Sequence, residues 1–411
     1  MRLTLSYKIS RDIDAALIIL LAFFAGAYNS RQYMPLLRIP AFENIFVIFL
    51  LLLILLNLWW ISAEILLRKR TKYENRRYWL PILIVIVSKN LLFLLQDYSM
   101  FREFHLGSFS RFMMDISLMA IFSLRISNWK KLEYSVMFFG IGCAIAPLIG
   151  FLFFPHMIAS RSQWVGGNFF NGGFWNSSVI GFIASAWLLI ALGNIKQRKH
   201  LSIILALLMC LGGLAGLSRA ILLSTIVSTS WYVMKNRNIK TSLLAFFTVM
   251  IFLVVAFSLF GDLTSSLLAR LNIAGIGNEA RLIIWKGYIN KIEEFFLWGA
   301  PIQGHRIYSP TGHDPHSVLL NWLSQYGILG LVSFLWLIWG LLKSAKIASM
   351  NINESSGNAL LTWIIAYLSL AIINETGFVE PSFYAAMGII LAWGNIGYIQ
   401  KTDTESKKCH V

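Results

Sequence analysis

Long runs of apolar residues constrain this chain more than any other feature of its sequence. Runs such as 41–66 and 316–342 carry few charges and exceed the length of about 20 residues that a helix needs to cross a bilayer. Backbone polar groups in hydrocarbon must be bonded within the spanning segment, and these runs lack the alternation of barrel strands. With 57% hydrophobic and 13% charged residues, the chain is predicted to be an all-α, polytopic membrane protein.

The hydropathy pattern predicts about twelve membrane-spanning helices. We expect one transmembrane domain over 1–411, with one larger loop, 261–315, inserted between the ninth and tenth spans. The predicted spans are 13–29, 41–66, 78–95, 109–126, 133–154, 174–194, 200–217, 219–234, 241–260, 316–342, 358–374 and 382–399.

Basic residues set the predicted orientation. They cluster in short segments on the same side of alternate spans, which is the positive-inside pattern, so the net charge of +16 indicates membrane topology rather than nucleic-acid binding. Both termini are therefore predicted to face the cytoplasm. The periplasmic face is predicted to carry the loops 97–108, 155–173, 261–315 and 375–381.

Two further features bound the class of protein. The run 13–29 is followed by basic residues rather than by a small-residue cleavage site, so we expect it to be a retained first helix. The three cysteines, Cys143, Cys210 and Cys409, lack the paired spacing of a disulfide framework or a zinc site and are expected to be packing residues. We expect neither a bound metal nor a cofactor.

Residues 200–234 carry a single charge, Arg219, in a mostly apolar stretch that is too long for one span. This stretch is predicted to be a hairpin or a broken helix with its break at Gly212 to Ser218. Arg219 then lies at the outer end of the hairpin. It either snorkels to lipid headgroups or supplies a cation at the mouth of an outward-facing cavity.

The 261–315 loop is predicted to contain an amphipathic helix that lies along the membrane surface or over the spans. Its predicted apolar stripe consists of Leu282, Trp285, Ile289, Ile292 and Phe296. Arg281 falls within that stripe, where a guanidinium is costly unless an anion meets it. It is therefore interpreted as a phosphate ligand, with pairing to Glu279 or Asp262 as the alternative.

Asp314 and Pro315 form a typical N-cap and first-turn pair, so the tenth span is predicted to begin there, with His316 in its first turn. The positive end of a helix favours a neutral imidazole, which is suited to removing a proton from a hydroxyl. The alternatives are an interfacial cap without chemical duty, a solvated loop residue in the case of His313, or metal ligation by His305, His313 and His316, whose spacing matches no usual zinc pattern.

Other polar residues are weaker candidates. Lys89 and Asp115 lie within apolar runs and are expected either to have a function or to pair with each other across adjacent spans. Glu375 and Glu380 frame an outer loop, where they could orient a sugar or cap a helix. The loop from Arg161 to Asn176 mixes aromatic and amide side chains, which suits contact with carbohydrate or lipid headgroups.

Several short motifs, taken in their order and spacing, resemble the O-antigen ligase and polymerase superfamily of bacterial inner membranes. The resemblance covers roughly residues 200–343 in motif terms. The motifs are Leu217-Ser218-Arg219-Ala220, Ala280-Arg281-Leu282-Ile283-Ile284-Trp285, Trp298-Gly299-Ala300-Pro301-Ile302-Gln303-Gly304, His316-Ser317-Val318-Leu319-Leu320 and Tyr326-Gly327-Ile328-Leu329-Gly330.

The resemblance implies a glycosyltransferase of the membrane-embedded C-type architecture, which takes glycan from undecaprenyl diphosphate at the periplasmic side of the inner membrane. It implies that Arg219 and Arg281 bind the diphosphate and that His316 activates the acceptor hydroxyl. Members commonly have Asn after this histidine, whereas this chain has Ser317. Accessory candidates are His313, Glu279 and Glu375.

The residue chemistry agrees with that implication, because the paired N–H groups of an arginine can stabilise a departing diphosphate without a metal. A single direct displacement would invert the configuration of the anomeric carbon. Ligation to lipid A-core is favoured, with repeat-unit polymerisation and protein O-glycosylation as alternatives that differ in acceptor. The expected partners are the lipid-linked donor, a lipid A-core or growing glycan acceptor and membrane lipids, but no nucleic acid. A polytopic transporter is the alternative of another class; it requires a pathway across the bilayer instead of an outer site.

Overall fold

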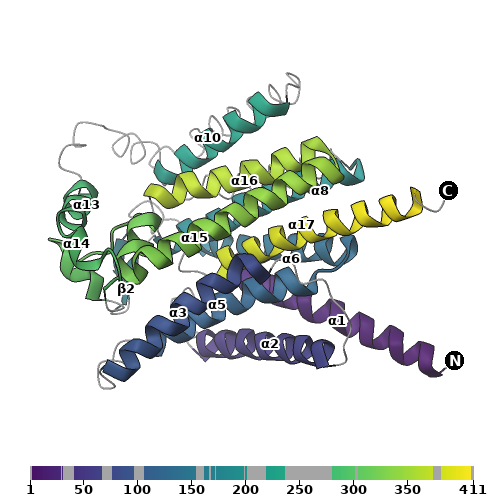
Figure 1. The fold of residues 1–411 in the computed structure, drawn as a ribbon, viewed down its shortest axis with the longest axis horizontal. Helices are drawn as coiled ribbons and strands as arrows, with labels where there is room; N and C mark the ends of the chain where they lie inside the picture. Colours follow the sequence, from purple (N-terminus) through teal and green to yellow (C-terminus); the bar gives the residue numbers. More distant parts are fainter. Residues whose placement is uncertain are drawn as a thin grey trace.

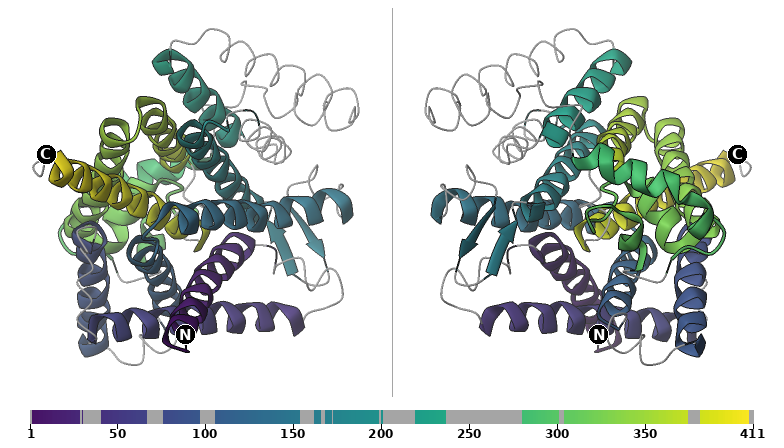
Figure 2. Two further views of the ribbon diagram at one scale, coloured as in Figure 1. Left: turned by 90° about the vertical axis from the view of Figure 1, so that its right-hand side faces the viewer. Right: turned by 90° about the vertical axis from the view of Figure 1, so that its left-hand side faces the viewer.

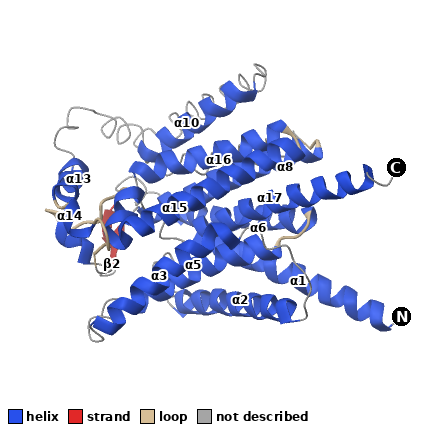
Figure 3. Ribbon diagram, in the orientation of Figure 1, coloured by secondary structure: helices blue, strands red, loops and turns tan. Residues whose placement is uncertain are grey.

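The computed structural model describes residues 2–28, 30, 41–66, 76–96, 106–153, 162–165, 168–171, 173–198, 200, 219–236, 280–300, 304–373 and 381–408. Helices make up most of this part of the chain (Figures 1 and 3). The long helices are α1 (Arg2–Ala27), α2 (Ala41–Leu66), α3 (Arg76–Gln96), α5 (Leu106–Arg125), α6 (Trp129–Phe153), α8 (Gly173–Lys196), α10 (Arg219–Asn236), α15 (Val318–Asn351), α16 (Glu354–Ile373) and α17 (Pro381–Lys408). The shorter elements are β1 (Ser162–Val165), β2 (Asn168–Asn171), α13 (Ala280–Asn290), α14 (Ile292–Phe295) and η4 (Gly304–Tyr308).

The prediction of a helical membrane protein is confirmed. Each predicted span that falls in the described part of the chain coincides with one of the long helices. Among the described residues, four helices are long and apolar enough to cross a membrane by length and composition: α2, α15, α16 and α17. The predicted spans 200–217 and 241–260 lie outside the described residues, apart from His200, so the count of about twelve stays a prediction.

One prediction about the loops was wrong. Residues in the predicted loop from Arg161 to Asn176 form a β-hairpin, in which β1 and β2 pair antiparallel with Trp164 opposite Phe169. Helix α8 then begins at Gly173, inside the same predicted loop. Aromatic residues such as Trp164, Phe169 and Phe170 are favoured in strands, whereas the asparagines beside them are depleted there and led the sequence prediction to a loop.

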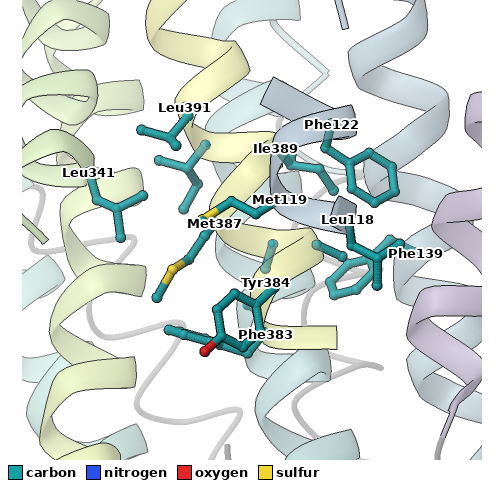
Figure 4. Close-up of a cluster of buried hydrophobic side chains, with 14 of the residues drawn as sticks. Leu118, Met119, Phe122, Phe139, Leu341, Phe383, Tyr384, Met387, Ile389 and Leu391 are labelled. Atoms are coloured by element: carbon teal, nitrogen blue, oxygen red, sulfur yellow. The ribbon is translucent and has the colours of Figure 1, made fainter. Parts of the chain in front are cut away.

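Helix α17 forms the centre of the bundle. Its first half is buried on all sides, and it packs against α5, α8 and α15. Figure 4 shows its Tyr384, Met387 and Ile389 between Leu118 and Phe122 of α5 on one side and Leu341 of α15 on the other. A helix that is apolar all round is stable only when other helices surround it, which explains the central place of α17.

A glycine contact and a side-chain hydrogen bond hold neighbouring helices close together. Gly26 of α1 and Gly142 of α6 face each other, and a Cβ at Gly142 would lie 2.2 Å from the Phe23 carbonyl oxygen. In α3, Pro81 cannot donate a hydrogen bond to the Arg77 carbonyl. The indole of Trp336 in α15 donates to that carbonyl at 2.9 Å instead, which ties α3 to α15.

Ion pairs gather at one end of the bundle. Asp14 of α1 pairs with Arg125 at the end of α5 and with Lys131 of α6, and Arg125 also donates to the Asn57 side chain of α2 at 2.5 Å. The guanidinium of Arg125 lies 5.2 Å from the ring of Trp60. The start of α1 and the end of α17 lie toward this end of the molecule in Figure 1.

The elements α13, α14 and η4 and the β-hairpin lie at the opposite end of the bundle (Figures 1 and 3). Viewed from that end, in the right panel of Figure 2, α13 and α14 lie in front of the bundle helices. We call α13, α14, η4 and the loop up to Ser317 the outer cap. The described residues of the predicted 261–315 loop, 280–300 and 304–315, therefore lie over one end of the bundle, whereas the ninth predicted span lies outside the described residues.

Candidate functional site

The outer cap has a small hydrophobic core of its own. Ile284 and Tyr288 of α13, Phe295 of α14, Tyr308 of η4 and Leu323 of α15 are buried against one another. The ring centroids of Phe295 and Tyr308 are 4.8 Å apart. Burial, with a smaller contribution from nearby Glu294, raises the pKa of the Tyr308 phenol. Since Leu323 belongs to α15, this core anchors the cap to the bundle.

Two hydrogen bonds hold the loop before α15 against α13, and an arginine of η4 binds a carboxylate of the same loop. The Trp285 indole donates to the Pro315 carbonyl at 2.5 Å, and the Tyr288 hydroxyl donates to the His313 carbonyl at 3.4 Å. Arg306 binds both carboxylate oxygens of Asp314, at 3.0 and 2.8 Å. The predicted helix-capping role of Asp314 is therefore wrong, because its carboxylate is engaged by the bidentate arginine.

His316 lies just before α15 rather than in its first turn, which corrects the prediction. Ser317 is the N-cap, with φ −141° and ψ 124°, and its carbonyl accepts the first helical hydrogen bond from Asn321 at 2.8 Å. His316 itself adopts a left-handed conformation with φ 48° and is partly exposed. This conformation is uncommon for a residue with a side chain and is concentrated at functional sites, where the surrounding structure holds it in place.

Ser317 stands at the position where the resemblance implies an asparagine. The Ser317 hydroxyl makes no capping hydrogen bond to the helix. Serine and asparagine are both favoured at an N-cap. That preference rests on a side-chain hydrogen bond that Ser317 does not make, so the structure does not explain the departure from asparagine.

Helix α15 breaks at Gly327, which has φ 66° and ψ −167°. The residues Phe296–Ala300, which we call the inserted segment, fill this break. In an unbroken helix the Ile328 amide would donate to the Ser324 carbonyl. Here the Ile328 amide donates to the Phe296 carbonyl at 2.7 Å, and the Ser324 carbonyl accepts from the Ala300 amide at 2.6 Å.

Glycines permit this close approach of two backbones. A Cβ at Gly327 would lie 2.3 Å from the Leu297 carbonyl oxygen, and a Cβ at Gly299 would lie 2.5 Å from the Gln325 carbonyl oxygen. Both glycines also have positive φ, which residues with side chains rarely adopt. The two glycine motifs singled out in the sequence are therefore partners in one junction.

Lys89 of α3 reaches the same junction from the bundle. It is 7% exposed, and its ammonium donates to the Ala300 carbonyl at 2.6 Å. The same group lies 5.2 Å from the ring centroid of Tyr326, the residue before the break. The predicted pairing of Lys89 with Asp115 stays a prediction; Asp115 is buried in α5.

The amphipathic helix predicted in the loop differs in two respects from what is observed. It is interrupted at Lys291, which separates α13 from α14. Its buried face consists of Ile284, Tyr288 and Phe295 rather than the predicted stripe, since Leu282, Ile289 and Phe296 are 44%, 57% and 41% exposed. Apolar residues occur on both faces of this helix, so periodicity alone did not determine which face packs on the bundle.

Arg281 is the second residue of α13. Residues four apart lie on the same face of a helix, about 6 Å from each other. Position 281 is therefore on the face of α13 that carries Trp285, whose indole contacts the residue preceding His316. Position 281 thus shares a face of α13 with Trp285, and its convergence with His316 stays a prediction.

Arg219 is the first residue of α10, and two contacts define the direction of this helix. The Ser224 hydroxyl donates to the Ala366 carbonyl of α16, and the rings of Tyr232 and Trp187 of α8 lie tilted with centroids 4.9 Å apart. Helix α8 ends beside the start of α16, so the last turns of α10 point toward that end. The first turn of α10 lies toward the opposite end, where α15 begins and the outer cap lies (Figure 1).

Among the other predicted site residues, His313 is exposed in the loop before α15. Glu279 and Glu375 lie outside the described residues, as do Glu380, Asp262 and the predicted break from Gly212 to Ser218. Within the described residues no group of three or more His, Cys, Asp or Glu side chains gathers in a way that could hold a metal ion.

Residues 204–335 match the model of a protein family described as O-antigen ligase. This match supports the resemblance of residues 204–335 to the O-antigen ligase and polymerase superfamily. Comparison with curated proteins gave no match. We call residues 204–335 the ligase-family segment; it contains Arg219, Arg281, His316, the inserted segment and the break at Gly327. The match supports a membrane enzyme of the glycosyltransferase type that serves polysaccharide biosynthesis.

Sequence reasoning about the ligase-family segment missed the residues that hold its parts together. The sequence predicts Trp285 in an apolar stripe, although its indole N–H donates a hydrogen bond to the loop that carries His316. Lys89 was noted only as an ionisable residue in an apolar run, and its partner Ala300 is distant in sequence. The one available signal was the rarity of a buried lysine, which always requires a polar partner.

Proposed function

We propose that the protein transfers a glycan from undecaprenyl diphosphate to an acceptor hydroxyl at the periplasmic face of the inner membrane. The observation that carries this proposal is the match of residues 204–335 to the O-antigen ligase family. It is supported by the unusual backbone of His316, with φ 48°, beside the start of α15, and by the α13 face on which position 281 lies.

In this reaction the acceptor oxygen bonds to the anomeric carbon as the bond from that carbon to the diphosphate oxygen breaks. His316 takes the proton of the acceptor hydroxyl, and undecaprenyl diphosphate leaves with its electron pair. Arg219 and Arg281 stabilise the charge that develops on the diphosphate, since one guanidinium group can donate two parallel hydrogen bonds to phosphate oxygens. A single displacement of this kind inverts the anomeric configuration and needs no metal.

Lipid A-core is our preferred acceptor, because one outer cap carries both position 281 and His316. Polymerisation of repeat units uses the same chemistry with a growing glycan as acceptor. The two functions are distinguished by deleting the gene and separating the surface glycans on a gel. Loss of all attached polymer indicates a ligase, and retention of a single repeat unit indicates a polymerase. Unchanged surface glycans would overturn the proposal.

The role of His316 is tested with variants that respect its backbone conformation. Alanine is strained at a φ of 48°, whereas asparagine and glycine tolerate this region. We therefore expect His316→Asn and His316→Gly to fold with wild-type thermal stability and to lose roughly 100- to 10,000-fold in transfer rate, the usual contribution of a general base. The rate is measured by complementation of the deletion strain and by gel densitometry.

Binding of undecaprenyl diphosphate to the purified variants provides the control for this experiment. A variant that lacks only the base binds this lipid as tightly as the unmodified protein does. The matched variant His313→Asn changes an exposed histidine in the same loop and should retain transfer. Transfer by His316→Asn at the unmodified rate would exclude His316 as the base.

A further inference from the structure

The junction between the inserted segment and the broken helix joins the outer cap to the bundle. Its two backbone hydrogen bonds, from Ala300 to Ser324 and from Ile328 to Phe296, lie on either side of Gly327. The half of α15 before the break leads directly back to Ser317 and His316. The direction of this short half-helix therefore determines where the candidate base lies relative to the bundle.

Lys89 is one contact through which the bundle holds this junction. Both polar backbone groups of Ala300 are engaged, because its amide donates to Ser324 and its carbonyl accepts from the Lys89 ammonium at 2.6 Å. The ammonium also lies 5.2 Å from the Tyr326 ring, close enough for a cation–π interaction. Lys89 thus contacts the inserted segment and the half-helix together.

The position of Lys89 makes this contact costly to lose. Without the ammonium, the buried Ala300 carbonyl loses its hydrogen bond to a charged donor. Such a bond contributes more free energy than a hydrogen bond between neutral groups. Tyr326 is itself packed edge-on against Phe112 of α5 at 5.6 Å, so the half-helix has a second contact with the bundle. Removal of the ammonium should therefore loosen the cap without unfolding the bundle.

We propose that Lys89 is a positioning residue for glycan transfer, which holds the inserted segment in the break of α15 and so fixes the place of His316. This inference rests on the proposed function for its catalytic consequence. Its structural content, that Lys89 sets the position of the outer cap, stands independently of any substrate.

The structural content is tested by distance measurement between pairs of spin labels in the full-length protein. One pair joins Thr311, exposed in the cap, to Leu55, exposed on α2; the control pair joins Leu55 to Met350, exposed at the far end of α15. In Lys89→Met we expect the cap-to-bundle distance distribution to broaden or shift, while the control distribution stays unchanged. Unchanged distributions for both pairs would overturn the proposal, and so would equal broadening of both, which indicates general loosening of the fold.

The catalytic content is tested with purified variants added to membranes of the deletion strain, which supply donor and acceptor. For Lys89→Met we expect kcat to fall about tenfold, with the KM for extracted lipid-linked donor unchanged within about twofold. Lys89→Arg retains a charged donor and should recover much of the lost kcat. A large rise in KM with unchanged kcat would assign Lys89 to donor binding and overturn the positioning role.

The two proposals fail in distinguishable ways. If the unmodified protein transfers no glycan, the proposed function fails, whereas the distance measurement still tests Lys89. If the unmodified protein is active and Lys89→Met retains full kcat with an undisturbed cap, only the positioning role fails. If Lys89→Met does not fold, the same measurements are made on Lys89→Gln, which keeps a neutral donor. An intermediate fall in kcat with a broadened cap-to-bundle distance distribution supports the proposal. No change in either quantity overturns it.

Discussion

At the scale of single residues, Trp285 supports the candidate base through one hydrogen bond. Its indole N–H donates to the Pro315 carbonyl, next to His316. Trp285→Phe keeps an aromatic ring but removes this donor, and a hydrogen bond of this kind contributes about 1 kcal/mol net. We expect kcat to fall roughly three- to tenfold and thermal stability to change little. Measurement of transfer rate and thermal unfolding on the same preparation checks both, and an unchanged rate would show that the bond does not position His316.

Arg281 offers a second prediction at this scale. If it binds the diphosphate through two N–H groups, Arg281→Lys keeps the charge but loses the paired geometry. Affinity for undecaprenyl diphosphate should fall at least about tenfold, since a charged hydrogen bond is worth roughly 1.5–3 kcal/mol. The matched variant Lys286→Arg, at an exposed position of the same helix, should bind normally. Full affinity in Arg281→Lys would be incompatible with bidentate binding.

The sequence indicated residue identities better than residue geometry. Motif spacing selected His316 as the candidate base, but its left-handed backbone before the helix was not predictable, because Asp314 and Pro315 form a good capping pair by local rules. The structure uses Asp314 to bind Arg306. Pairing with Arg306, eight residues earlier in the chain, thus overrides the capping preference of Asp314 and Pro315.

At the scale of secondary-structure elements, the break in α15 depends on glycine. A Cβ at Gly327 would lie 2.3 Å from the Leu297 carbonyl oxygen, and φ is 66°. Gly327→Ala should therefore expel the inserted segment or shift α15, with a loss of about 1–3 kcal/mol in stability from backbone strain alone. The expected result is loss of glycan transfer, with weakened protection of the Ala300 and Ile328 amides in hydrogen exchange.

Gly312 provides the control for this prediction. It also has positive φ, 70°, but a Cβ there would meet nothing within 4 Å. Gly312→Ala tests the conformational strain without the steric conflict and should cost about 1–2 kcal/mol. If Gly327→Ala were no more harmful than Gly312→Ala, the close approach of the two backbones would not be needed for function.

Helices were predicted well because each apolar run is long and bounded by charged residues. The observed α2 coincides with the predicted span 41–66. The interruption of α15 was not predicted, since Gly327 lies in an apolar stretch and a glycine costs a helix only about 1 kcal/mol. Only contact with the inserted segment, which is separated from Gly327 by a long loop, turns that weak tendency into a break.

At the scale of the whole molecule, the two ends of the bundle differ in chemistry. One end carries the buried ion network of Asp14, Arg125 and Lys131 together with the start of α1 and the end of α17. The other end carries the outer cap with His316. The positive-inside pattern assigns the first end to the cytoplasm, and a reaction that uses a periplasmic donor then requires the cap on the opposite side.

This orientation is tested by labelling single cysteines in sealed membrane vesicles with a membrane-impermeant maleimide. In a chain whose Cys143, Cys210 and Cys409 are changed to Ala, Thr311→Cys reports on the cap and Lys130→Cys on the opposite end; both positions are exposed. In right-side-out vesicles we expect Thr311→Cys to react and Lys130→Cys to be protected, and inverted vesicles should reverse the result. Equal labelling of both sites after detergent solubilisation confirms that accessibility, not reactivity, causes the difference. Reaction of Thr311→Cys only in inverted vesicles would place His316 in the cytoplasm, where a periplasmic donor cannot reach it, and the proposed transferase would be excluded.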